Sequence, residues 1–276
     1  MFIADAQVHI WGADAPERPW PPGQAHRAHR PTPFSKDDLL AEMAAAGVDR
    51  AVIVPPSWEG DRNDLALAAA GAHPDKFAVM GRPPLDRRDP RALDRWREQP
   101  GMLGIRVTTA GAGTRALFTE PEGDGLWQAA ERAGLPAMVS IPGLLPELGR
   151  LAERHPGMRF VIDHLALVRD AKDEAAFGDL ANLLALARHP NIAAKASALP
   201  RYSSESYPYR RLHAPLEQVF EAFGPQRFFW GTDMTGIPCT YRQAATLFTE
   251  ELSWLKGADL ELVMGRALCD WLGWPI

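Results

Sequence analysis

A chain of 276 residues, 46% hydrophobic and 24% charged, has an ordinary globular composition and is long enough to bury a large core. The net charge of −5 gives no electrostatic reason to expect binding to nucleic acid or to an anionic membrane. No apolar run approaches the ~20 residues of a membrane helix, and the first residues lack the basic start and cleavage site of a signal peptide.

The chain contains two cysteines, Cys239 and Cys269, whose separation matches neither a zinc motif nor a disulfide framework. We therefore expect a cytoplasmic protein in a reducing compartment. Its partner is expected to be a small molecule. The apolar tail at residues 271–276 could join an interface between copies of the chain and form a homo-oligomer.

One sequence pattern repeats along the chain: a short apolar or β-branched run, a loop and then a helical segment. The runs typical of strands lie at residues 1–11, 50–55, 76–82, 102–108, 136–141, 159–165, 191–197 and 227–233. Helices are predicted at residues 36–46, 64–72, 90–99, 124–133, 144–155, 173–187, 209–223, 242–255 and 260–272. Alternating strands and helices indicate a parallel sheet, and eight units in about 250 residues favour a closed (β/α)8 barrel. A glycine fingerprint G-x-G-x-x-G after the first strand, which would favour dinucleotide binding, is missing.

Local signals set several of these boundaries. Ser35 is predicted to cap the first helix with Asp38, and Asn63 to cap the second. The pair at residues 89–90, Asp-Pro, is typical of a further helix start, and a glycine-rich loop is predicted at residues 110–113. The proline-rich segment at residues 12–33 has no periodicity and contains His26 and His29. A connection of this length predicts a functional lid loop or a disordered segment.

Polar residues that fall late in the predicted strands are candidates for a site, because active sites of such barrels lie at the carboxyl ends of the strands. Asp5, Gln7 and His9 alternate along the first strand and are predicted to share one face. The other late polar residues are Arg82, Arg106, Ser140, Asp163, His164, Lys195, Ser197 and Asp233. Ser140 lacks the G-x-S-x-G context of a serine nucleophile, so serine hydrolysis is disfavoured.

Five motifs in order along the chain resemble the amidohydrolase superfamily, and more closely its amidohydrolase-2 group of lactonases and related hydrolases. That group includes 2-pyrone-4,6-dicarboxylate lactonase, sulfomuconolactone hydrolase and sugar lactonases. The motifs are Asp5-x-Gln7-x-His9, Gly104-Ile105-Arg106, Val161-Ile162-Asp163-His164-Leu165, Lys195-Ala196-Ser197 with Pro200-Arg201-Tyr202-Ser203, and Trp230-Gly231-Thr232-Asp233. The resemblance covers essentially the whole chain, so we expect residues 1–276 to form a single amidohydrolase-like barrel domain.

The resemblance implies a role for three of these residues. Asp233 matches the aspartate of the eighth strand, which draws a proton from the attacking water. His9 matches the second histidine of the first-strand H-x-H motif, and His164 matches the histidine of the sixth strand. Ester hydrolysis needs a base on the water and electrophilic help on the carbonyl oxygen, and a carboxylate beside two imidazoles, or beside a metal that they hold, can supply both.

The chain departs from the family pattern at Gln7, which stands where the family most often has the first histidine. A glutamine carbonyl is a poor zinc ligand, and Ser140 stands where metal-dependent members commonly carry a ligand. His9, His164 and Asp233 remain as candidate metal ligands. The sequence therefore leaves two alternatives open: the protein uses no cofactor, or it binds one divalent metal, zinc or manganese.

Other residues are assigned to substrate binding, with Gln7 among them. Arg106 is predicted to place a guanidinium fork on a substrate carboxylate or carbonyl, its alternative being a structural salt bridge. Arg201 and Tyr202 resemble the substrate loop of the family, the alternative being an ordinary surface loop. Trp11 and Trp58 could wall the pocket. Lys195 is expected to pair with Asp163 or Asp233 as part of the scaffold rather than to form a Schiff base.

The sequence thus predicts an ester-bond hydrolase, a lactonase that opens a small cyclic ester. One alternative is a metal-dependent non-oxidative decarboxylase of hydroxybenzoate-type acids, which Gln7 disfavours because that reaction needs a firmly held metal. The other is a non-catalytic barrel that binds small acids. The sequence names neither the lactone nor a role for His26 and His29.

Overall fold

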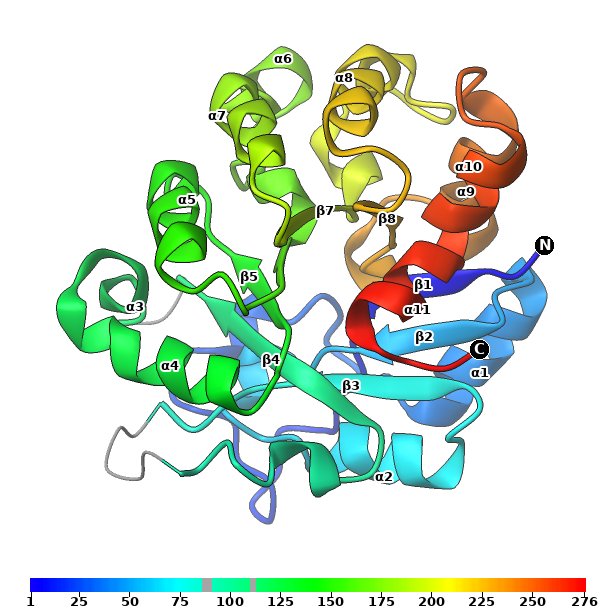
Figure 1. Ribbon diagram of the computed structural model, residues 1–276. Helices are drawn as coiled ribbons and strands as arrows, with labels where there is room; N and C mark the ends of the chain where they lie inside the picture. The colour runs from blue at the N-terminus through cyan, green and yellow to red at the C-terminus, as the bar shows by residue number, and fades with distance from the viewer. Residues whose placement is uncertain (86–90, 110–112) are drawn as a thin grey trace.

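The computed structural model describes residues 1–85, 91–109 and 113–276, which form eight parallel strands wound into a nearly closed barrel with helices outside (Figure 1). Neighbours along the chain are neighbours in the sheet, from the first strand to the last. The strands are β1 (Ala4–Val8), β2 (Arg50–Ile53), β3 (Phe77–Gly81), β4 (Met102–Thr108), β5 (Ala137–Ser140), β6 (Phe160–Ile162), β7 (Ile192–Ala196) and β8 (Phe228–Trp230). The predicted (β/α)8 barrel is therefore confirmed.

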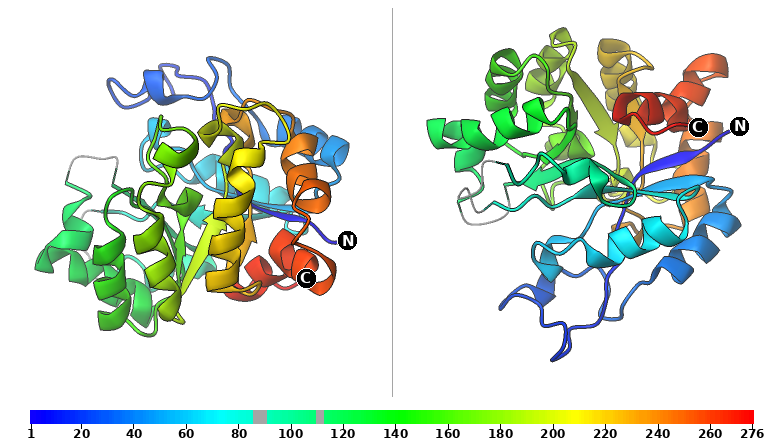
Figure 2. Two further views of the ribbon diagram at one scale, coloured as in Figure 1. Left: turned by 90° about the horizontal axis from the view of Figure 1, so that it is seen from above. Right: turned by 60° about the horizontal axis from the view of Figure 1, so that its bottom comes forward.

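The helices lie around the outside of the strands, as the two further views show (Figure 2). They are α1 (Lys36–Ala46), α2 (Asp64–Ala72), α3 (Ala116–Thr119), α4 (Asp124–Arg132), α5 (Leu145–Arg154), α6 (Asp173–Ala176), α7 (Leu180–Ala185), α8 (His213–Phe223), α9 (Tyr241–Thr246), α10 (Gly257–Glu261) and α11 (Ala267–Leu272). Helix α1 matches its prediction, with Ser35 and Asp38 forming a reciprocal capping box and Gly47 ending the helix at φ 75°. No helix in the described residues is long and apolar enough to cross a membrane.

Three predicted helices are wrong in detail. The helix predicted at residues 173–187 is divided into α6 and α7, and Gly178, a poor helix former, lies between them. The two predicted C-terminal helices contain π-helical turns at Leu247–Glu251 and Leu262–Arg266. The second of these turns brings Gly265 so close to β1 that a Cβ there would lie 2.6 Å from the backbone nitrogen of Ala4.

The helix predicted at residues 90–99 is also different. Its Asp-Pro start, like residues 110–112 of the predicted glycine-rich loop, lies outside the described residues. Residues 91–99 form turns and a 3₁₀ helix, Trp96–Glu98, instead of an α-helix. Trp96 is buried and donates its indole N–H to the carbonyl of Gly104, 3.0 Å away, so packing against β4 decides the path of this segment.

The seam between β1 and β8 depends on one buried carboxylate. Asp5 accepts hydrogen bonds from the backbone N–H and hydroxyl of Thr232, at 2.9 and 2.5 Å, and from the hydroxyl of Tyr241 on α9, at 2.8 Å. It also accepts from the N–H of Gln7, and Gln7 in turn accepts from the N–H of Asp233. The prediction that Asp5 shares a face with Gln7 and His9 is wrong, because the pairing register is irregular between Asp5 and Val8.

Candidate active site

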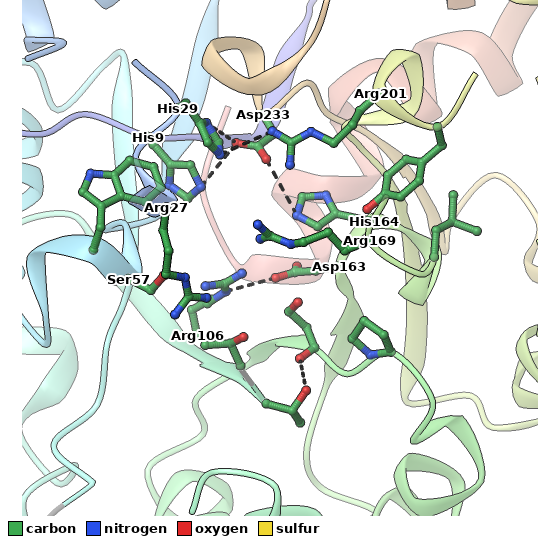
Figure 3. Close-up of a pocket in the computed structure, with 17 residues that line it drawn as sticks. His9, Arg27, His29, Ser57, Arg106, Asp163, His164, Arg169, Arg201 and Asp233 are labelled. Atoms are coloured by element: carbon green, nitrogen blue, oxygen red, sulfur yellow. Dashed lines mark hydrogen bonds and ion pairs between the residues drawn. The ribbon is translucent and has the colours of Figure 1, made fainter. Parts of the chain in front are cut away.

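A pocket of about 240 Å³ opens at the carboxyl ends of the strands, where the candidate residues were predicted to gather (Figure 3). It is lined by His9, Arg27, His29, Ser57, Trp58, Arg106, Thr108, Thr109, Ser140, Pro142, Asp163, His164, Leu167, Arg169, Arg201, Tyr202 and Asp233. These residues come from segments far apart in the sequence, and β1, β4, β5, β6 and β8 each lead into at least one of them.

Two of the central side chains reach the pocket through a left-handed backbone. Strands β6 and β8 end at Ile162 and Trp230, earlier than predicted, and His164 and Asp233 follow with φ values of 52° and 53°. This conformation costs a residue with a Cβ about 1–2 kcal/mol, and such strain collects at functional sites. The early strand ends therefore free both side chains from the regular alternation of the sheet.

Asp233 lies at the centre of three imidazoles. Its Oδ1 is 3.2 Å from His9 Nε2 and 3.8 Å from His29 Nδ1, and its Oδ2 is 3.9 Å from His164 Nε2. The side chain of Asp233 is only 3% exposed, and Oδ1 is buried without a hydrogen-bond donor among the described residues. A buried carboxylate oxygen without a donor is costly unless a bound molecule supplies one.

His9 cannot supply that donor as a neutral imidazole. Its Nδ1 is 2.5 Å from the carbonyl oxygen of Val54, which can only accept, so Nδ1 carries the proton. Its Nε2 then presents a lone pair to Asp233 Oδ1. His9 Nε2 and Asp233 Oδ1 are thus two acceptors 3.2 Å apart, and a proton between them or a donor bound to them would complete their hydrogen bonding.

His164 is fixed as a neutral acceptor by a chain of hydrogen bonds. Lys195 is fully buried, and its ammonium lies 2.5 Å from both Asp163 Oδ1 and Gln7 Oε1. The amide oxygen of Gln7 therefore faces the ammonium, and its NH₂ donates to His164 Nε2 at 3.3 Å. The remaining ring nitrogen, Nδ1, donates to the hydroxyl of Ser197 at 2.8 Å. The expected scaffold pairing of Lys195 with Asp163 is confirmed.

Burial and charge set the protonation states around Asp233. Burial lowers the pKa of His9 to about 3 and that of His164 to about 4, although the Asp233 carboxylate opposes both shifts. Burial alone would raise the pKa of Asp233, but the positive charges of Arg201 and of the surrounding histidines in their protonated form lower it well below its usual range. The site at neutral pH therefore holds an ionised carboxylate among neutral imidazoles.

Four arginines among the described residues give the pocket a positive lining. Arg106 is 8% exposed and lines the pocket, and its Nε donates to Asp163 Oδ2 at 3.2 Å. The structural salt bridge is therefore present, and the guanidinium fork on a substrate carboxylate or carbonyl stays a prediction. Arg201 donates from Nε to the carbonyl of Gly236 and approaches His29 Nε2 at 3.4 Å. Arg27 and Arg169 were not assigned from the sequence. Only their places, in the proline-rich segment and in the loop after β6, could have suggested them.

The segment at residues 12–33 contributes Arg27 and His29 to the pocket but not His26, which is exposed. His29 Nδ1 is 2.9 Å from the hydroxyl of Thr235. Whether the segment moves as a lid stays a prediction. Of the two tryptophans, Trp58 lines the pocket and contacts the His9 and His29 rings, whereas Trp11 packs behind it against Phe34.

The hydrogen bonds that Gln7 makes with His164 and Lys195 also determine whether a metal can bind in the pocket. No group of three or more His, Cys, Asp or Glu residues in the described parts of the chain is arranged to hold a metal ion. The His164 Nε2 lone pair that a metal would need accepts from Gln7, and the oxygen of Gln7 is taken by Lys195. His9, His164 and Asp233 as they stand therefore do not fit a three-ligand zinc or manganese site.

The family model for amidohydrolases matches residues 4–265. The chain belongs to the amidohydrolase family. It is 29% identical over 237 residues to an L-fucono-1,5-lactonase from Burkholderia ambifaria, covering 84% of this chain and 80% of that protein. It is 25% identical to a 4-sulfomuconolactone hydrolase from Hydrogenophaga intermedia, covering 83% of this chain and 73% of that protein.

A crystal structure of an amidohydrolase from Burkholderia multivorans with bound zinc has the same fold, with a TM-score of 0.80. The two chains align over 100% of both lengths at 21% sequence identity. The expected resemblance to the amidohydrolase family and its lactonases is thus confirmed, and this amidohydrolase has the hydrolase barrel that the motifs indicated.

Proposed function

We propose that this amidohydrolase is a lactonase, built as one barrel domain, that opens a small cyclic ester by adding a water molecule activated by Asp233. The observation that carries the proposal is the buried Asp233 Oδ1, which has no donor among the described residues although it lines the pocket. A water bound there would donate the missing hydrogen bond and stand next to the base that deprotonates it. The relatives named for lactone hydrolysis support a cyclic ester as the substrate.

In this reaction Asp233 Oδ1 takes a proton as the water oxygen bonds to the lactone carbonyl carbon. The lone pair of His9 Nε2, 3.2 Å from Oδ1, can share that proton and keep it in the site. The carbonyl oxygen becomes an oxyanion. The ring C–O bond then breaks, and the leaving alkoxide recovers the proton from the Asp233–His9 pair, which gives a free hydroxyl and a carboxylic acid that loses its remaining proton to solvent.

Arginine is the better candidate for stabilising the oxyanion. His9 and His164 were predicted to polarise the carbonyl, but each is held with its Nε2 as an acceptor and has no N–H to offer there. The Arg106 guanidinium lines the pocket, and Asp163, itself fixed by Lys195, holds it in place. A preorganised cation of this kind stabilises charge that develops in the transition state. Tyr202 and Trp58 would wall the ring.

The decarboxylase alternative depends on a firmly held metal, which the described side chains do not fit. No further observation favours it. The non-catalytic barrel predicts binding of small acids without turnover, so the same assay decides between these functions.

The test is turnover of a lactone panel by the parent protein, Asp233→Asn and the surface control Asp37→Asn. We expect Asp233→Asn to lower kcat about 100- to 10,000-fold, because the amide keeps the shape but removes the base. Asp37 is 75% exposed outside the pocket, so its variant should match the parent. Undiminished turnover by Asp233→Asn would contradict the proposed base, and a parent protein without turnover on any lactone would contradict the proposed function.

A further inference from the structure

The proline-rich segment at residues 12–33 is anchored to the barrel at its base and near its start. The residues on either side of it, Trp11 and Phe34, exchange backbone hydrogen bonds of 2.9 and 3.2 Å. Within the segment, Arg18 donates from Nε to the buried carboxylate of Glu59, which follows β2, at 2.8 Å. The segment is therefore held in a defined position, and the side chains that it contributes to the pocket are held with it.

His29 is the imidazole that this segment places in the pocket, beside His9 and Asp233 (Figure 3). Its side chain is 9% exposed, and the centre of its ring lies 4.9 Å from that of Trp58 and 5.5 Å from that of His9. Gly236 makes room for the ring, because a Cβ there would lie 2.9 Å from His29 Nδ1. The lactone chemistry proposed above gives this side chain no role.

Arg201 determines which ring nitrogen of His29 carries the proton. Its Nη2 lies 3.4 Å from His29 Nε2, and a guanidinium donates hydrogen bonds but accepts none. The Nε2 atom therefore accepts, and the proton of the neutral ring lies on Nδ1. Arg201 is itself fixed, because its Nε donates to the carbonyl of Gly236 at 2.9 Å. His29 thus presents an N–H toward Asp233, whereas the two imidazoles from the barrel strands present lone pairs.

The N–H of His29 faces the carboxylate oxygen of Asp233 that has no donor among the described residues. Nδ1 lies 3.8 Å from this Oδ1 atom, which is too long for a direct hydrogen bond. A water molecule that donates to Oδ1 at about 2.8 Å can lie within about 3 Å of Nδ1 as well. The same N–H also donates to the hydroxyl of Thr235 at 2.9 Å, and one N–H can be shared between two acceptors. A bound water is therefore the species that both groups can contact together.

We propose that His29 is a further catalytic residue, whose Nδ1–H donates to the oxygen of the attacking water and orients it. This inference rests on the proposed lactonase function and adds a contact to its nucleophile. A water has two hydrogens and two lone pairs. One hydrogen points to Asp233 Oδ1 and the other to His9 Nε2, two acceptors 3.2 Å apart, while His29 engages one lone pair.

These three contacts leave the second lone pair of the water to attack the lactone carbonyl carbon. His29 keeps its own proton during the reaction, since the proton that the water loses passes to Asp233. Its contribution is orientation, which lowers the barrier because the reacting atoms are held in line before the bond forms.

The test compares kcat and KM of the parent, His29→Leu and the matched control His26→Leu on a lactone that the parent opens. His26 lies in the same segment but is exposed and outside the pocket. We expect His29→Leu to lower kcat about 10- to 100-fold, because a misdirected nucleophile reacts slowly, and to change KM by less than about threefold. His26→Leu should match the parent. Equal kcat values for the parent and His29→Leu would overturn the inference.

Two amide variants separate hydrogen bonding from packing. The side-chain amide of Asn reaches the place of the imidazole Nδ1, whereas that of Gln reaches the place of Nε2. His29→Asn should therefore recover part of the kcat that His29→Leu loses, and His29→Gln should recover less. An equal kcat for the two amide variants would assign the loss to ring packing against Trp58 and overturn the inference. The two amides still give this comparison if thermal unfolding shows that His29→Leu folds poorly.

Crystallography separates this inference from the lactonase proposal. A crystal structure of the parent should show a water within hydrogen-bonding distance of both Asp233 Oδ1 and His29 Nδ1, and that of His29→Leu should lack it. This result supports the orienting role even if the parent opens no lactone, an outcome that contradicts the proposed function alone. A water that is absent from the parent, or unchanged in His29→Leu, overturns the inference even if lactones are hydrolysed. Nitrogen-15 NMR of the histidine rings checks the tautomer, and a proton on His29 Nε2 instead of Nδ1 would overturn the inference as well.

Discussion

Two buried aspartates, Asp5 at the β1–β8 seam and Asp233 at the pocket, lie close together in the fold. They differ in the hydrogen bonds that their carboxylates receive and in the direction of their pKa shifts. Asp5 receives donors from Gln7, Thr232 and Tyr241, and burial raises its pKa to about 6. Asp233 has an oxygen without a donor among the described residues, and its pKa lies below the usual range. A carboxylate whose oxygens are all engaged holds the barrel together, whereas one with an oxygen left open is available for a reaction.

The largest expected change in stability is at the seam. Asp5→Ala removes the acceptor of two backbone N–H groups and two hydroxyls, which then stay buried without partners. We expect the free energy of unfolding to fall by about 3 kcal/mol or more. Urea denaturation measures it. Asp37→Asn, on the surface, is the control, and an equal stability for Asp5→Ala would show that the seam does not depend on this carboxylate.

The pH dependence of stability sharpens the contrast. The folded-state pKa of Asp5 is about 6, above the ordinary aspartate value of 3.8, so between these values the folded protein keeps a proton that the unfolded chain has lost. The contribution of Asp5 to stability therefore falls as pH rises from about 4 to about 6. The unfolding free energy of the parent minus that of Asp5→Asn should decrease over this range. A difference that is flat or rises with pH would contradict the raised pKa.

The histidines around Asp233 change the free energy of unfolding with pH in the opposite direction. Their folded-state pKa values, about 3 for His9 and about 4 for His164, lie below the ordinary histidine value of 6.5, so the unfolded chain binds protons first as pH falls. Their contribution is present above pH 6.5 and is lost progressively below it. This is the reason for measuring the Asp5 effect as a difference from Asp5→Asn, in which both histidines are unchanged.

The smallest expected effect is that of metal removal. A metal on Asp233 Oδ1 would give that oxygen a partner. Both aspartates would then have all their carboxylate oxygens engaged. Because His164 Nε2 and the oxygen of Gln7 are already engaged, we expect prolonged chelation to leave lactone turnover within about twofold of the untreated protein. Elemental analysis should find less than one zinc or manganese per chain. Loss of turnover on chelation with recovery on adding zinc would contradict this arrangement.

The sequence predicted the barrel because its period of strand, loop and helix repeats eight times, and it predicted the site because strand ends meet at one edge. His9, Arg106, His164 and Asp233 do line one pocket. The early ends of β6 and β8 could not be predicted, since the left-handed backbone at His164 and Asp233 has no marker such as glycine. The capping rule that predicted Ser35 correctly failed at Asn63, where a tertiary contact with Arg82 takes the side chain.

The role of Gln7 is the clearest example of a feature that could be recognised only in the structure. From the sequence it is a departure from a histidine pair and an assigned substrate residue. In the fold it is fully buried and joins Lys195 to His164, so it sets the tautomer of that histidine. Side-chain hydrogen bonds between β1, β6 and β7 create that role, and no spacing along the chain encodes them.

The most direct test of the central claim measures activity and stability together in Asp233→Asn and Asp5→Asn, using lactone turnover and urea denaturation. We predict that Asp233→Asn loses about 100-fold or more in kcat, while its unfolding free energy stays within about 1 kcal/mol of the parent. Asp5→Asn, in which the seam loses one acceptor oxygen, should lose stability and keep the kcat of its folded fraction. A kcat for Asp233→Asn equal to that of the parent, or a loss fully explained by unfolding, would contradict the assignment of Asp233 as the base.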